Sequence, residues 1–220
     1  MEEEEKSEEY EDFDFFLFSA LSDGREFMRE ILQTREKDLF FRCALVWKLA
    51  EEIQRCIEEE RIFFCEQLFL RYKEPAYINK LEGEIRFWLK ENEIRYILSE
   101  KWYKYLYKLE LLEESWFWLL KESEDILYGE GKDGYIKLHK RFFRWLEKNM
   151  EEWEIIWEQL SVYFIDTYFC GAVYDGEAAG KIRLSFVSVF LIWELLTARW
   201  KKNGEDLNME DIIPVSYTHL

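Results

Sequence analysis

The sequence predicts an all-α fold, a multi-helix bundle rich in aromatic side chains and without a significant sheet. Its 220 residues include only two prolines and nine glycines, where average usage would give roughly 11 and 15, and this shortage favours long helices. Apolar residues recur in steps of three and four along several segments, and no segment alternates convincingly with a period of two. The 18 Phe, 13 Tyr and 10 Trp residues can fill much of a core with rings.

The charge balance is strongly acidic. Thirty Lys and Arg residues oppose 47 Asp and Glu residues, which gives a formal net charge of −17. Charge of this sign repels phosphate backbones and anionic lipid headgroups, so we expect no nucleic-acid partner and no membrane partner. Hydrophobic residues make up 49% of the chain and charged residues 35%, a balance typical of a folded globular protein.

Three parts are predicted along the chain. Residues 1–14 hold nine acids and one lysine, and this run predicts a disordered acidic tail. Residues 15–212 are expected to form a single helical domain. Residues 213–220 break the helix-rich composition and resemble a translated sequencing-adaptor sequence, so we expect a non-native or disordered tail there.

The cysteines predict no zinc site. They are 13, 9 and 105 positions apart without a Cys-x-x-Cys pair, and the only histidines are His139 and His219. We expect no metal, and free thiols in a reducing, cytoplasmic compartment: Cys43, Cys56, Cys65 and Cys170. The acidic start lacks the apolar segment of a secretory signal. The longest apolar stretch, Leu184–Ala198, is too short to span a bilayer and is interrupted by Glu194.

The first third of the chain predicts three helices after a short apolar run. We expect a turn at Ser22–Gly24, whose residue types favour turns, and then a helix over Arg25–Thr34. Asp38–Glu60 is the most clearly amphipathic segment, and its predicted inward stripe is Leu39, Phe40, Cys43, Val46, Trp47, Ala50, Ile53 and Ile57. The next helix starts at Arg61 and stops before Pro75, because a residue before proline disfavours the helical conformation.

The middle third predicts further helices. Residues 77–107 form one interrupted helix or two consecutive helices, with Gly83 and Asn92 as the weak points. Glu110–Leu127 predicts another helix, with these residues facing inward: Trp116, Phe117, Leu119, Leu120 and Ile126. A turn is expected over Tyr128–Tyr135, which contains three glycines.

The last third predicts helices over Tyr135–Met150, Glu151–Cys170 and Lys181–Lys202, with a glycine-rich connection at Gly171–Gly180. The last of these helices is the most hydrophobic. Its predicted inward stripe is Ile182, Phe186, Val189, Phe190, Trp193, Leu196 and Trp200.

One glycine motif matches a known pattern letter for letter. Gly129–Gly134 reads G-x-G-x-x-G, which in dinucleotide-binding proteins follows a buried strand and brings backbone amides onto a pyrophosphate. Here a predicted helix precedes it, and Glu130 and Asp133 would lie beside the anion. We therefore interpret the segment as a flexible interhelical loop.

Few residues stand out as candidates for chemistry. Tyr174 and Asp175 lie in the connection between the two most apolar helices, where a phenol and a carboxylate can reach a cleft. The alternative is an Asx turn in which Asp175 caps the next helix. Asp166 interrupts an apolar helix and needs a partner, for which Arg183 and Arg199 are the candidates.

Two other features point less clearly to a function. His139 lies in a basic patch of a predicted surface helix without a second histidine nearby, so no metal or triad role is predicted. The aromatic rings can form a cage for a cation or, in the plainer interpretation, an ordinary core. The residue types alone therefore name no reaction.

Several short strings resemble the bacterial flagellin lysine-N-methylase family. The weaker part comprises residues 25–33, Arg-Glu-Phe-Met-Arg-Glu-Ile-Leu-Gln, and the string Ala-Glu-Glu-Ile-Gln at 50–54. The more specific strings follow the order and spacing of the family's C-terminal half: Gln159–Phe164, Ala172–Gly176, Phe186–Ser188, Glu194–Leu195 and Ala198–Trp200.

This resemblance implies a lysine N-methyltransferase that modifies lysine side chains of flagellin, with S-adenosylmethionine as the expected donor. The acceptor amine must be neutral to attack, so a carboxylate or a tyrosine near a desolvated pocket would help. On this basis Tyr174 and Asp175 are the predicted catalytic residues, and Arg199 is the predicted cofactor-binding cation.

The sequence departs from the family at both ends. Family members carry an N-terminal cysteine-rich segment and continue past the last helix, whereas this chain opens with acidic residues and ends in Tyr-Thr-His-Leu. We therefore expect a fragment of the enzyme, its C-terminal helical portion. The alternative function is a non-catalytic, all-helical protein-interaction module that binds partners through grooves between aromatic helices.

Overall fold

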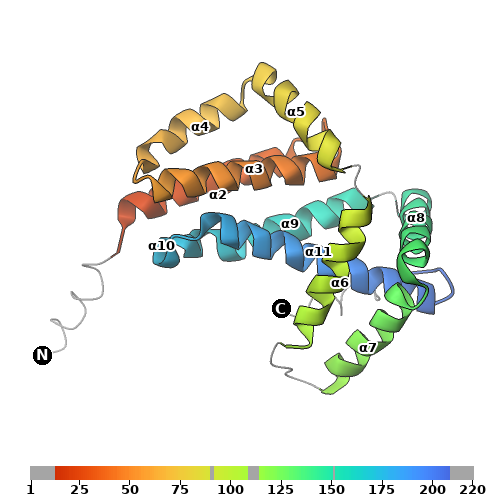
Figure 1. The fold of residues 1–220 in the computed structure, drawn as a ribbon. Helices are drawn as coiled ribbons and strands as arrows, with labels where there is room; N and C mark the ends of the chain where they lie inside the picture. The colour runs from red at the N-terminus through yellow and green to blue at the C-terminus, as the bar shows by residue number, and fades with distance from the viewer. Residues whose placement is uncertain (1–12, 90–91, 109–113, 151, 209–220) are drawn as a thin grey trace, which may run out of the picture. The chain divides into compact units, whose positions relative to one another are not determined.

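The computed structural model describes residues 13–89, 92–108, 114–150 and 152–208, and within them it is helical without a strand. The elements in chain order are α2 (Phe15–Gln33), α3 (Leu39–Glu58), η1 (Ile62–Phe64), α4 (Cys65–Tyr72), α5 (Pro75–Leu89), α6 (Asn92–Leu106), α7 (Glu114–Tyr128), α8 (Gly131–Asn149), α9 (Trp153–Tyr168), η2 (Phe169–Gly171), α10 (Ala172–Asp175) and α11 (Ala178–Lys202) (Figure 1). The predicted all-α class is confirmed.

The chain divides into two compact units, each made of two stretches of sequence. Unit 1 comprises residues 1–86 and 158–186, and unit 2 comprises residues 87–157 and 187–220. The predicted tails fall almost wholly on residues 1–12 and 209–220, which lie outside the described part of the chain. The division into tails and one domain stays a prediction.

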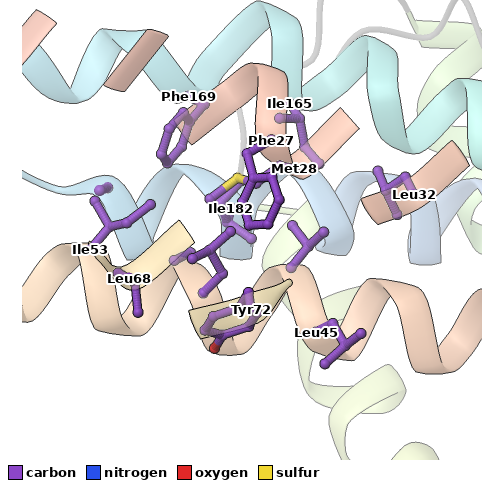
Figure 2. Close-up of a cluster of buried hydrophobic side chains, with 14 of the residues drawn as sticks. Phe27, Met28, Leu32, Leu45, Ile53, Leu68, Tyr72, Ile165, Phe169 and Ile182 are labelled. Carbon is purple, nitrogen blue, oxygen red and sulfur yellow. The ribbon is translucent and has the colours of Figure 1, made fainter. Parts of the chain in front are cut away.

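The core of unit 1 is aliphatic and aromatic and is built around α2. Figure 2 shows Phe27, Met28 and Leu32 of α2 in one cluster with Ile53 and Leu45 of α3. Further members come from elements distant in sequence: Leu68 and Tyr72 of α4, Ile165 of α9, Phe169 of η2 and Ile182 of α11. Burying such side chains from water is the main stabilisation of this unit.

The predicted turn at Ser22–Gly24 is wrong, because these residues lie inside the continuous helix α2. Gly24 is buried, and a Cβ atom there would lie 3.3 Å from Ile53 Cδ1 and 3.5 Å from Phe169 Cε1. The glycine is present because neighbouring side chains approach the α2 backbone closely and not because the chain reverses. Tertiary packing has overridden the local preference.

Helix α3 has the predicted extent, but its buried face is rotated relative to the predicted stripe. Leu39, Val46, Ala50 and Ile53 are buried as expected. Phe40 is 43% exposed, and three residues outside the prediction are buried: Phe41, Leu45 and Leu49. The first half of α3 is apolar on nearly all sides, so the polar face of the second half alone could not fix the rotation of the helix.

The core of unit 2 is largely aromatic. The Trp193 ring of α11 lies with its centroid 4.8 Å from that of Trp157, 5.6 Å from that of Phe142 and 6.2 Å from that of Trp153. Ring pairs at these separations add to the burial term. The predicted inward position of Trp193 is confirmed, since the residue is 6% exposed.

The glycine-rich connection predicted at 171–180 is much shorter in the structure. Residues up to Asp175 belong to η2 and α10, and α11 starts at Ala178. Gly176 has a φ of 71°, in the left-handed region that favours glycine, and it ends α10.

All four cysteines are free thiols. Burial raises the pKa of Cys43 to about 12, which keeps this thiol protonated. Within the described residues, no group of His, Cys, Asp and Glu side chains could hold a metal ion. Over the same residues, none of the helices has the length and apolar character that a bilayer span requires.

Candidate functional site

Glu194 is a buried carboxylate with no exposed surface, in the second half of α11 in unit 2. Its Oε2 lies 3.0 Å from His139 Nε2, and its Oε1 accepts a hydrogen bond from Tyr135 Oη at 2.9 Å. Arg95 Nη2 lies 3.3 Å from the same Oε1. We call Glu194, His139, Tyr135 and Arg95 the Glu194 cluster. A carboxylate this deeply buried requires such partners.

Helical spacing brings the partners of Glu194 together. Tyr135 and His139 are four residues apart on α8, so their side chains lie on one face, with ring centroids 4.3 Å apart. Arg95 comes from α6, and its guanidinium lies 5.5 Å from the Phe190 ring centroid and 5.8 Å from that of Trp193. These ring faces hold the cation in a fixed place.

A layer of tyrosines surrounds the cluster. Tyr128 stacks on Tyr135 with centroids 5.7 Å apart, and Tyr96 meets Tyr135 edge-on at 5.4 Å. Ser99, which is fully buried, forms a hydrogen bond with the Tyr128 hydroxyl. Burial raises the pKa of Tyr135, and the charge on Glu194 raises it further, so this hydroxyl stays protonated and donates.

The geometry fixes the protonation state of His139. Its Nδ1 lies 3.3 Å from Arg95 Nη2, which can only donate, so Nδ1 accepts and the ring proton is on Nε2. Burial lowers the pKa of His139, although Glu194 opposes the shift. Burial alone would raise the pKa of Glu194, but His139, Arg95 and Tyr135 together lower it. The cluster therefore pairs a neutral imidazole with an ionised carboxylate.

Both ring nitrogens of His139 are thus occupied by protein groups. The imidazole can accept a proton from a substrate only if Arg95 withdraws from Nδ1. Arg95 has the most exposed side chain of the four, at 32%. In the arrangement described, the cluster orients α6, α8 and α11 and holds a neutral imidazole next to a carboxylate.

The pH dependence of stability tests this protonation state. The unfolded chain has an ordinary His139 pKa and binds a proton more readily than the folded protein does. The stability contributed by the neutral ring is therefore complete above about pH 6.5 and is lost as the pH falls, by up to about 1.4 kcal/mol per pH unit. We expect His139→Gln to flatten this part of the profile. Urea unfolding at pH 7.5, 6.5 and 5.5 measures it, and parallel profiles for the two proteins would contradict the assignment.

A second buried carboxylate lies in unit 1. Glu158 of α9 has a side chain that is 1% exposed, and it accepts from Arg35 Nη2 and Arg42 Nη1, each at 2.7 Å. Hydrogen bonds from Arg35 lower the pKa of Glu158, burial opposes them, and Arg42 lowers it further. Arg42 is 2% exposed and also donates from Nε to the Lys37 carbonyl at 3.0 Å. This group ties α9 to the start of α3.

The predicted residues Tyr174 and Asp175 lie together at an exposed corner of unit 1. Tyr174 is 82% exposed and its ring lies 6.1 Å from that of Phe13. Asp175 Oδ1 accepts from the Glu177 backbone N–H at 3.0 Å, so the alternative prediction of an Asx turn is confirmed. Hydrogen bonds from Lys181 and then from Glu177 hold the pKa of Asp175 below its usual value.

A side chain of α3 holds this corner through two hydrogen bonds. Gln54 Nε2 donates to the Gly176 carbonyl at 3.0 Å, and Gln54 Oε1 accepts from the Ala179 N–H at 3.1 Å. This side-chain amide therefore holds the backbone on both sides of the Asx turn. The third predicted residue, Arg199, is a half-buried side chain near the end of α11 in unit 2.

Two sequence interpretations need correction. His139 is buried and bonded to Glu194, whereas a surface helix was predicted, because the basic residues around it lie on the opposite face of α8. Asp166 pairs with Arg29, at 2.9 Å, and not with Arg183 or Arg199. Arg29 lies 137 positions away, a separation that no local pattern could reveal.

Glu194 and Glu158 were missed as functional candidates. Glu194 carried a usable signal, since a single acid inside the apolar stretch 184–198 must be buried and partnered. The sequence around Glu158 gives no such signal of burial, because this segment contains other polar residues. The turn predicted over Tyr128–Tyr135 and the loop predicted at Gly129–Gly134 are much shorter in the structure, because α7 runs to Tyr128 and α8 already starts at Gly131. A helix and not a strand precedes the glycine motif, as the sequence predicted.

Comparison with known proteins gives one family. A family model described as the FliB lysine N-methylase C-terminal domain matches residues 25–219. No curated protein and no solved structure matches the chain. The match covers both units and includes every residue of the Glu194 cluster and of the Tyr174–Asp175 corner.

Proposed function

This chain belongs to the FliB lysine N-methylase C-terminal domain family, and we propose that it forms part of an enzyme that methylates lysine side chains of flagellin. The observation that carries the proposal is the family match over residues 25–219. We further propose S-adenosylmethionine as the methyl donor and the cytoplasm, where flagellin is made, as the place of action.

The Tyr174–Asp175 corner is our proposed contact for the acceptor lysine. An exposed phenol ring can cover the aliphatic part of a lysine side chain, and a carboxylate can pair with its ammonium group. Asp175 pairs with Lys181 Nζ in the free protein, so the acceptor ammonium would share or replace this partner. Because its pKa is lowered, Asp175 is suited to bind an ammonium and not to accept its proton.

Arg199 is our proposed contact for the donor. S-adenosylmethionine ends in a carboxylate, and a guanidinium binds a carboxylate through paired hydrogen bonds. The half-buried position of Arg199 fits this role, since partial desolvation strengthens such a pair. When bound, the donor supplies the electrophilic methyl group, and the protein supplies binding and orientation.

Methylation of purified flagellin tests the proposal. The chain is assayed alone and in a chimera that adds the flanking segments of a full-length relative, with mass spectrometry scoring lysines that gain one methyl group. We expect turnover by the chimera, reduced about tenfold or more by Asp175→Asn, the size of a lost charge-assisted hydrogen bond. The chain alone is expected to turn over more slowly, because the matched family model is a C-terminal domain and misplacing catalytic groups by about 1 Å can cost 100-fold.

Asp133→Asn is the matched control, since Asp133 is an exposed aspartate at the start of α8 in unit 2. It should leave turnover unchanged. A chimera that never methylates flagellin would contradict the proposed function. A chimera that is active and indifferent to Asp175→Asn would remove the corner from the site and leave the enzyme class standing.

A further inference from the structure

A groove lies in unit 1 and is lined by residues of the C-terminal half of α3 and of the segment that η1 and α4 form after it. Its volume is about 410 Å³, within the range of small-molecule pockets. Neither Asp175 nor Arg199 lines it, so it is separate from the contacts proposed above. We call it the α3–α4 groove.

The two carboxylates of the groove are already neutralised by cations of the groove itself. Glu52 pairs with Arg71 and also accepts from the Tyr77 hydroxyl at 2.9 Å. Glu59 pairs with Arg61. Neither carboxylate is therefore left to neutralise a further charge.

Arg55 is the third cation of the groove, and no described residue pairs with it. The acidic side chains at helical spacing from Arg55 bond to other groups, although α3 holds three acids and three bases in all. Besides the two groove carboxylates, Glu51 accepts from Trp47 Nε1 at 2.8 Å and Glu58 accepts from Gln54 Nε2 at 3.1 Å. Glu51 and Glu58 keep their charges beside Arg55 but do not line the groove, whose own lining holds three arginines against two glutamates.

Apolar surface adjoins this cation. Leu68 is buried beneath the groove, and Cys56 is half-buried in its wall. Phe64 exposes 38% of its surface, and the side-chain amide of Gln67, also exposed, adds neutral hydrogen-bonding groups. A ligand that complements this surface needs a single negative charge next to an apolar group.

We propose that the α3–α4 groove binds a small-molecule carboxylate that has an adjoining apolar group, with Arg55 pairing with the carboxylate and Phe64 contacting the apolar part. A guanidinium binds a carboxylate through two parallel hydrogen bonds, which favours a carboxylate over a neutral amide of the same shape. The small volume and the single surplus charge favour a small ligand over an acidic polypeptide.

Alkylation of Cys56 reports occupancy, because this thiol lines the groove. The probe is 3-phenylpropionate, and 3-phenylpropionamide is the uncharged control of the same shape. Mass spectrometry follows the rate of iodoacetamide modification in the intact chain. We expect phenylpropionate to slow the modification of Cys56 and not that of Cys170, a half-buried thiol outside the groove.

The variant Arg55→Gln should raise the half-protecting concentration of phenylpropionate about tenfold or more, the size of a lost charge-assisted hydrogen bond. Arg55 is exposed, so the fold should be intact, and circular dichroism checks this. Arg183→Gln, which removes an exposed arginine of α11 in the same unit, should have no effect. Equal protection by the amide, or equal protection in Arg55→Gln, would overturn the proposal.

The same protection experiment with S-adenosylmethionine shows whether the carboxylate that binds the groove is that of the methyl donor. If the donor protects Cys56 in an Arg55-dependent way, the groove holds the donor itself. If phenylpropionate protects and the donor does not, the groove serves another carboxylate. Both results support the groove, and the flagellin assay tests the proposed function separately.

Discussion

Trp193→Ala should lower the free energy of unfolding by about 3–5 kcal/mol, the usual cost of truncating a buried tryptophan. The indole is 6% exposed and its ring contacts those of Trp157, Phe142 and Trp153, so the variant leaves a cavity in the aromatic core of unit 2. The surrounding rings are large and stiff, which limits how far they can collapse into the space. Urea denaturation followed by circular dichroism measures the effect.

Two exposed positions serve as controls for this prediction. Trp118→Ala removes the same side chain from unit 2 at a position that is 58% exposed, and Glu58→Ala alters the solvated face of α3. We expect about 0.5 kcal/mol for Glu58→Ala and a similarly small loss for Trp118→Ala. Denaturation midpoints for Trp193→Ala that match either control would mean that the inward face of α11 is assigned wrongly.

Glu158→Ala should be comparably damaging, at about 3–5 kcal/mol, for an electrostatic reason. The change removes the carboxylate 2.7 Å from Arg42, whose side chain is 2% exposed, and so breaks a buried ion pair from one side. Arg35 is half-exposed and can turn to solvent, so the loss arises mainly at Arg42. The measurement is again the free energy of unfolding in urea at neutral pH.

Asp166→Ala is the matched control on the same helix, because Asp166 also pairs with an arginine but has a side chain that is 35% exposed. An exposed pair contributes about 0.2–1 kcal/mol. The double variant Glu158→Leu with Arg42→Met should recover most of the loss, since replacing both charges leaves no buried ion. Equal losses for Glu158→Ala and Asp166→Ala would contradict the role of burial.

Periodicity predicted the helices well and their exact faces less well. α3 has the predicted span because apolar residues recur at helical spacing, and α11 begins only three residues before its predicted start. The predicted turn at Ser22–Gly24 is wrong because glycine favours a turn but also permits close packing inside a helix. Only contact with Ile53 and Phe169 shows that Gly24 serves close packing. That information lies elsewhere in the sequence.

The site was harder to predict than the helices. The family resemblance pointed correctly to a lysine N-methylase C-terminal domain, since it rested on several strings in a fixed order. The Glu194 cluster was not predicted because its partners lie 55, 59 and 99 positions from Glu194 in the sequence, farther than any local pattern reaches. His139 looked like a surface residue because the lysines and arginines beside it on α8 suggested solvent.

The discontinuous makeup of unit 1 has a consequence for how the chain folds as it leaves the ribosome. Residues 1–86 emerge first, but Ile165, Phe169 and Ile182 of the same core come only after residues 87–157 have been translated. At about 5–20 residues per second this gap lasts several seconds, far longer than hydrophobic collapse takes. Throughout that interval α3 and α4 can pack on α2, but the part of the core that Ile165, Phe169 and Ile182 cover stays exposed to solvent. Nascent chains stalled between the two stretches should therefore aggregate more readily than the complete chain.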